Sequence, residues 1–297
     1  MTTPQAETLI DALNTTFGRH KGRRASHAKG LQARGRFLPA TPAGEVSVPY
    51  LKTEHPVTAR FSIGGGKPGI SDKSPTVRGI GLRIGTGDNS WALALISVPV
   101  FFANSAEQFR AFLAARQPDP DLGGPNPERV KAFNEANPNT LPHQQYLAST
   151  APCQSYTTER YHSGHAYGFD GVQTIVGRLV MDPEQGRQGL SEAKMASTSD
   201  DFLTDALEAS LAQQPARWTL KIIVANDADE TGDPTEPWDG AHDEIVLGTI
   251  EITDLAPEDA HEVFDPAAMP KGVHAPQDAV FGLRSAAYAV SHARRQS

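Results

Sequence analysis

The sequence predicts an α+β fold, in which an antiparallel β-barrel is surrounded by helices and followed by a C-terminal helix. Three observations predict it: a strictly alternating segment at residues 57–63, further strand patterns without regular helical crossovers, and a long unbroken helical pattern at the end of the chain. The 297 residues also include 26 Gly and 23 Pro, which favours many turns and long connections. Because successive parallel strands need crossover helices, the irregular order of elements favours antiparallel pairing.

The clearest strand pattern lies at residues 57–63. Its apolar residues recur at every second position: Val57, Ala59, Phe61 and Ile63. A strand places such residues on one face, so Arg60 and Ser62 are predicted to share the opposite face. This opposite face is either exposed to water on the barrel exterior or part of a polar site.

The remaining strands and helices are predicted from the periodicity of apolar residues, from helix-capping residues and from residues that interrupt helices. Further strands are expected at residues 77–84, 91–102, 172–181, 217–225 and 244–253, with a glycine-rich loop at 64–69. Helices are expected after Ser105, which forms a capping box with Gln108, after Asn126, and at residues 200–213; residues 1–25 are an amphipathic lead-in. The last helix is expected to begin near Pro276 and has no breaker from 278 to 295.

Composition narrows the class of partner. A net charge of -8 argues against nucleic acid and against anionic membranes, and no segment is long and apolar enough to cross a membrane, so we expect a small-molecule ligand. Cys153 is the only cysteine, which excludes an internal disulfide and a thiolate zinc cluster. Met1 to Asn14 lacks the features of a secretory signal, which predicts a cytoplasmic location.

The final helix carries a polar stripe. Its members recur at helical spacing on one face: Arg284, Tyr288, His292 and Arg295. The stripe is either a solvated face or the wall of a polar site, and the small alanines around Tyr288 would let a flat cofactor approach the backbone. A tyrosine binds ferric iron only as a phenolate, and Arg284, one turn earlier, would stabilise that anion.

His27 precedes the predicted sheet. A lone histidine is most often a surface or structural residue, but Arg60 and Ser62 offer it partners. A serine hydroxyl would fix the tautomer of the ring, and a guanidinium would bind an anionic group of a cofactor. These residues therefore form a candidate site for acid–base chemistry.

Several segments together resemble the haem catalase family. They occur in the family's order and are His27–Gly30, Gly35–Phe37, Arg60–Ser62, Pro99–Phe102, Phe264–Pro270 and Arg284–Tyr288. The likeness covers residues 20–297, and the short chain is similar to the catalase-related peroxidase branch. It implies one catalase-like domain over residues 1–297, with residues 1–20 as a lead-in, a haem b group in the barrel and no C-terminal flavodoxin-like domain.

The resemblance also implies roles for individual residues. On the distal side of the haem it implies His27 as acid and base, Ser62 as its orienting partner and Phe101 as a flanking aromatic. It implies that Arg24, Arg60 and Arg295 bind the propionates. On the proximal side it implies Tyr288 as iron ligand, Arg284 as partner of the phenolate, and His165 with Asp278 as an extension of that relay.

One departure from the family bears on the reaction. Large catalases place an asparagine near the distal histidine, in the pattern N-T-P-x-F-F, where this chain has Ser97. A serine presents no amide N–H to the second peroxide oxygen, so peroxidase chemistry is favoured over dismutation of hydrogen peroxide. We therefore expect a haem peroxidase that uses a peroxide and an organic electron donor, with weak catalase activity and a homodimer implied by the family.

Three alternatives stay open at this point. The same scaffold would also suit a lyase or isomerase of fatty-acid hydroperoxides, which needs no external donor. A haem carrier or sensor would need no ordered acid–base pair such as His27 and Ser62. A barrel without haem would bind some other apolar ligand.

Overall fold

The computed structural model describes residues 3–41 and 45–296. The longer helices are α1 (Thr3–Phe17), α2 (Ala106–Ala115), α3 (Pro127–Ala136), α4 (Leu141–Ser149), α5 (Glu192–Ser197), α6 (Phe202–Gln213) and α7 (Phe281–Gln296). The strands are β1 (Gly30–Pro39), β2 (His55–Ile63), β3 (Arg78–Ile84), β4 (Trp91–Ile96), β5 (Tyr161–Phe169), β6 (Ile175–Pro183), β7 (Ala216–Val224), β8 (Glu244–Ala256) and β9 (Val273–His274).

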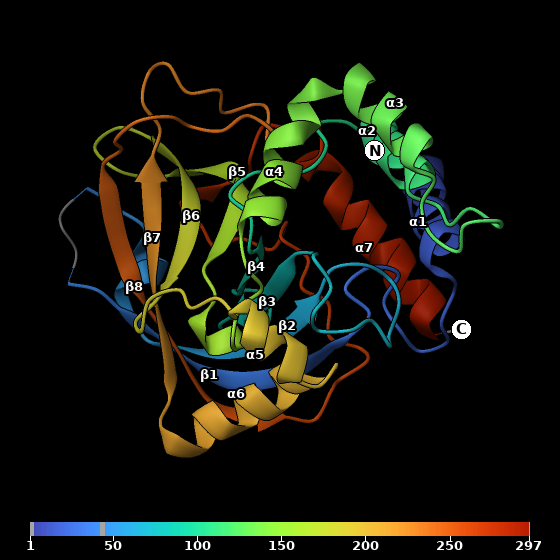
Figure 1. The fold of residues 1–297 in the computed structure, drawn as a ribbon. Helices are drawn as coiled ribbons and strands as arrows, with labels where there is room; N and C mark the ends of the chain where they lie inside the picture. Colours follow the sequence, from blue (N-terminus) through green and yellow to red (C-terminus); the bar gives the residue numbers. More distant parts are fainter. Residues whose placement is uncertain (1–2, 42–44, 297) are drawn as a thin grey trace.

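Strands β1 to β8 form a closed antiparallel barrel (Figure 1). The strand order is β4-β3-β2-β1-β8-β7-β6-β5, and β4 meets β5 where Ile96 pairs with His162, which closes the sheet. The short strand β9 continues the sheet beyond β5. The predicted α+β class with an antiparallel barrel and surrounding helices is therefore confirmed.

The barrel interior is filled with large apolar side chains. The alternating residues of β2 all belong to this core, and the ring of Phe61 lies 5.2 Å from that of Tyr156 and 5.9 Å from that of Trp218. The opposite face of β2 is buried as well, since Arg60 and Ser62 are 3% and 4% exposed. This face therefore lies on the outer wall of the barrel and is nevertheless shielded from water.

A helical layer packs beside the barrel. Leu9, Ile10 and Leu13 of α1 form a second apolar cluster with Leu113 of α2 and Ala287 of α7. The start of α7 contacts the barrel, because the ring of Phe281 lies 5.7 Å from that of Tyr167 on β5. Figure 1 shows α7 running along the barrel on the side where α1 and α2 lie. The first turn of α7 is therefore held against the barrel wall.

Several predicted boundaries were wrong. The strand predicted over residues 91–102 ends at Ile96, and the strand predicted to begin at Val172 begins at Ile175, with Val172 94% exposed. Ser105 does cap α2, but the Gln108 side chain accepts the N–H of Asn104 instead of completing the capping box. β1 and β5 were not predicted as strands.

The last helix also begins later than expected, at Phe281. The carboxylate of Asp278 accepts the N–H of Phe281 at 2.7 Å, so it satisfies one of the free donors of the first turn. Asp278 therefore fixes where α7 begins.

Replacing Phe61 by Ala should lower the free energy of unfolding by about 3–5 kcal/mol, because it leaves a cavity in the filled barrel. Urea denaturation of the purified chain measures this. The matched control Val172→Ala removes an exposed side chain and should change stability by less than about 0.5 kcal/mol. Equal effects of the two substitutions would contradict the packing described here.

Candidate active site

His27 is held in a strained backbone conformation just before β1. Its φ is 54°, the only positive φ of a non-glycine residue among residues 3–41 and 45–296. The Arg60 guanidinium donates to the carbonyls of His27 (2.9 Å) and Ala28 (3.3 Å), which fixes the segment against β2. Such strain costs on the order of 1–3 kcal/mol and persists where the surroundings impose it. Arg60 therefore positions the imidazole.

The ring of His27 has a defined tautomer. The Ser62 hydroxyl donates to the carbonyl of Gly79 (3.3 Å), so its oxygen accepts the Nδ1 proton of His27 (2.9 Å). Nε2 then keeps its lone pair. The ring fits here because position 79 has no side chain: a Cβ on Gly79 would lie 2.7 Å from the imidazole. The predicted pairing of His27 with Ser62 is thus present in the structure.

His27 is neutral over the physiological range. Burial is the largest cause that lowers its pKa, from the ordinary value of 6.5 to about 4. The positive charges of Arg60, Arg284 and Arg24 lower the pKa in the same direction. The contribution of Arg284, on α7, also shows that the helix stripe and His27 lie within electrostatic reach of each other. A neutral imidazole with a free lone pair is able to accept a proton.

The arginines predicted to bind propionates form a cationic cluster. Arg60 and Arg295 are buried, and Arg24 is half-buried beside them. The pKa of Arg24 is lowered to about 9, mainly by burial and in addition by the positive charges of Arg60 and Arg295. Nε of Arg295 is buried without a hydrogen-bond partner. Glu258 pairs with both Arg24 and Arg60, so positive charge exceeds negative charge in the cluster, and a further anionic ligand would reduce this excess.

On α7, the Arg284 guanidinium donates to the phenolic oxygen of Tyr288 at 3.0 Å. This is the contact that the spacing of four residues predicts. The positive charge of Arg284 is also one of the causes that lower the pKa of His27, so the two groups influence each other electrostatically. The site thus combines a phenol that has a cationic partner with a neutral imidazole.

The predicted relay behind Arg284 is formed only in part. Nδ1 of His165 donates to the Asp278 carboxylate at 2.8 Å, and both side chains are 1% exposed. Nε2 of His165, however, has no hydrogen-bond partner, so no hydrogen bond continues from this pair to Arg284. The His165–Asp278 pair therefore secures the start of α7, where Asp278 is also the cap.

Two predicted residues have contacts that differ from those expected. The hydroxyl of Ser97 accepts the backbone N–H of Arg78 at 2.9 Å, and thereby ties the end of β4 to β3. The ring of Phe101 lies 5.8 Å from that of His165, which the resemblance assigned to the other side of the cofactor. The distal roles of Ser97 and Phe101 stay predictions.

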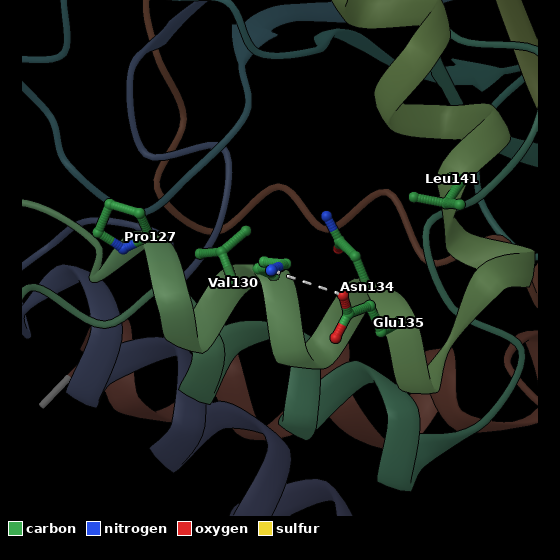
Figure 2. A pocket seen from close by; sticks show the side chains of 6 residues that line it. Pro127, Val130, Asn134, Glu135 and Leu141 are labelled. Atoms are coloured by element: carbon green, nitrogen blue, oxygen red, sulfur yellow. Dashed lines mark ion pairs between the residues drawn. The ribbon is translucent and has the colours of Figure 1, made fainter.

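A surface hollow of about 470 Å³ lies elsewhere, beside α3 and the start of α4 (Figure 2). Its lining residues are Pro127, Val130, Lys131, Asn134, Glu135 and Leu141. The Lys131–Glu135 ion pair of 3.9 Å is solvent-exposed, and none of the candidate site residues lines the hollow. Its chemistry is that of an ordinary helical surface.

Comparison with known proteins gives the family. The family model described as Catalase matches residues 5–297. The chain belongs to the catalase family.

Relatives of this catalase-family chain include a catalase-related peroxidase from Synechococcus elongatus, 32% identical, with 97% of this chain and 87% of the relative covered. A catalase-related peroxidase from Mycolicibacterium paratuberculosis is 31% identical, with 95% and 92% covered. Among solved structures, catalase A from Saccharomyces cerevisiae superposes with a TM-score of 0.82 at 20% identity, over 97% of this chain and 64% of that chain. This last likeness concerns the fold.

The residues of this catalase-family site fit a haem group. A planar dicarboxylate would add negative charge to the cluster of Arg24, Arg60 and Arg295, and guanidinium groups suit carboxylates geometrically. The phenol of Tyr288 with its cationic partner is a donor suited to ferric iron.

Among residues 3–41 and 45–296, no helix is long and apolar enough to cross a membrane.

Two site residues were missed from the sequence. Gly79 pairs with Ser62 across β2 and β3, and a glycine inside a predicted strand is a signal of close approach. Glu258 bonds to both Arg24 and Arg60, and no local pattern marks it. Its position depends on contacts across most of the chain.

In the haem-free chain, the ring of His27 should titrate near pH 4 instead of near 6.5, because burial and the neighbouring arginines disfavour the imidazolium. NMR of histidine-labelled protein between pH 8 and 3.5 measures this, and His27→Gln identifies the signal. The Nδ1-protonated tautomer should be present throughout the neutral range. Titration between pH 6 and 7 would contradict the geometry.

Proposed function

We propose that residues 1–297 form a single haem domain that acts as a peroxidase, reducing hydrogen peroxide or organic hydroperoxides with an external electron donor. The observation that carries the proposal is the neutral His27 with its Ser62 partner, within electrostatic reach of the Arg284–Tyr288 pair. Family membership agrees, and two relatives that are 32% and 31% identical to the chain are named catalase-related peroxidases.

The cofactor of this proposal is haem b. Arg24, Arg60 and Arg295 would bind its propionates, and Tyr288 would ligate the iron, with Arg284 holding the phenolate. When bound, the haem supplies the iron at which the peroxide is reduced and through which electrons pass. The hydrogen bond and positive charge that Arg284 offers to the phenolic oxygen would stabilise its anionic form as an iron ligand.

The chain's own contribution is proton transfer. His27 Nε2 accepts a proton from the near oxygen of the peroxide and returns it to the far oxygen as the O–O bond breaks. A hydroperoxide then yields an alcohol and water, at the expense of two electrons and two protons from the donor. General acid–base help of this kind is worth about 10²–10⁴ in rate.

The peroxidase reaction is favoured over dismutation by Ser97. The site lacks an amide donor at this position, and the Ser97 hydroxyl is engaged with the backbone of Arg78. No structural observation favours a lyase or isomerase, or a carrier. An organic donor, a homodimer and a cytoplasmic location stay predictions.

The test uses the hemin-loaded chain with hydrogen peroxide and an oxidisable dye, and beside it a lipid hydroperoxide without a donor. We expect dye oxidation that His27→Ala slows by about 10²–10⁴ with haem retained, because the proton acceptor is lost. The control His274→Ala alters an exposed histidine and should leave the rate unchanged. An unaffected rate in His27→Ala would refute the proposed base, and donor-free rearrangement of the lipid substrate would favour the lyase.

A further inference from the structure

A carboxylate of the chain itself occupies the arginine cluster. Oε1 of Glu258 accepts from Arg60 Nε at 2.9 Å and from Arg24 Nη1 at 3.2 Å. Oε2 lies 3.5 Å from the guanidinium of Arg23. Glu258 therefore uses donor groups of Arg24 and Arg60, two of the three arginines that the proposed function assigns to the haem propionates.

The backbone around Glu258 is anchored independently of this side chain. The N–H of Asp259 donates to the Gln32 side chain, and the Gln296 amide donates to the carbonyl of Ala260 at 3.0 Å. The Glu262 carboxylate pairs with Arg83 at 2.7 Å, away from the cluster. The Glu258 side chain is 31% exposed, so it can rotate into solvent without moving the loop.

The charges of the arginine cluster favour the exchange of Glu258 for another carboxylate. Without Glu258, the buried Arg60 would lose its carboxylate partner, which would leave an uncompensated charge in the fold. Glu262 contributes its backbone carbonyl oxygen to the cluster, which accepts hydrogen bonds from Arg24 and Arg295 but carries no full negative charge. An incoming carboxylate can replace Glu258 at both guanidinium groups, whereas a neutral group cannot.

We propose that Glu258 is an internal counter-ion of the haem site, which a cofactor carboxylate displaces from Arg24 and Arg60, so that Glu258 sets how tightly the chain retains haem. The inference rests on the proposed function and deepens it. In the empty chain Glu258 stabilises the arginine cluster, and on loading it competes with the ligand for the same donors. Removing its charge should therefore strengthen binding of a dicarboxylate porphyrin and weaken the empty fold.

The experiment compares hemin with hemin dimethyl ester, which has no carboxylates, in absorbance titrations of the empty chain. Glu258→Gln should lower the Kd for hemin by about fivefold or more, since one repulsive charge is removed, and leave the Kd for the ester unchanged. Transfer of hemin to a scavenger protein should slow by a similar factor. The empty variant should also unfold at a lower urea concentration than the wild type.

The control Asp254→Asn removes an exposed carboxylate four residues before Glu258, and it should change the Kd values for hemin and for its ester equally little. If Glu258→Gln fails to fold, Glu258→Asp, with a shorter reach, should show the same preference for hemin. Weaker or unchanged hemin binding in the folded variant overturns the inference while wild-type binding upholds the haem site. A wild-type chain that binds no hemin overturns the proposed function as well.

Discussion

Buried guanidinium groups need anionic or carbonyl partners, and this constraint organises the whole site. Arg60, 3% exposed, donates to the carbonyls of His27 and Ala28 and to Glu258, so it fixes both the strained histidine and the loop after β8. Arg284 donates to Tyr288 on the same face of α7. An unpaired buried charge costs several kcal/mol. The arginines therefore hold the imidazole and the phenol in place and leave the site receptive to an anionic cofactor.

The barrel makes this arrangement possible because both faces of its wall are buried. The inner face of β2 carries the apolar side chains of the core, and the outer face carries Arg60 and Ser62 under the helical layer. Gly79 on the neighbouring strand leaves room for the ring of His27. The site is thus built on the barrel wall. The half-buried carboxylate of Glu258 is the group that we propose to give way when a cofactor carboxylate binds the arginines.

Sequence reasoning succeeded where the signal is local. The alternation of β2 predicted that Arg60 and Ser62 share a face, and helical spacing predicted the contact of Arg284 with Tyr288. It failed for β5, whose pairing is interrupted by an irregularity between His162 and Ala166, and for β1, which has no strict alternation. Contacts between distant segments, such as Glu258 with Arg60, follow from barrel closure and leave no local pattern.

The central claim is that the phenol of Tyr288, held by Arg284, ligates the haem iron. Resonance Raman spectra of the hemin-loaded chain with ring-deuterated tyrosine test it most directly. The account predicts isotope-sensitive phenolate vibrations in the wild type and in the control Tyr146→Phe, and their loss in Tyr288→Phe. Phenolate vibrations that persist in Tyr288→Phe, or that never occur in the loaded wild type, would contradict it.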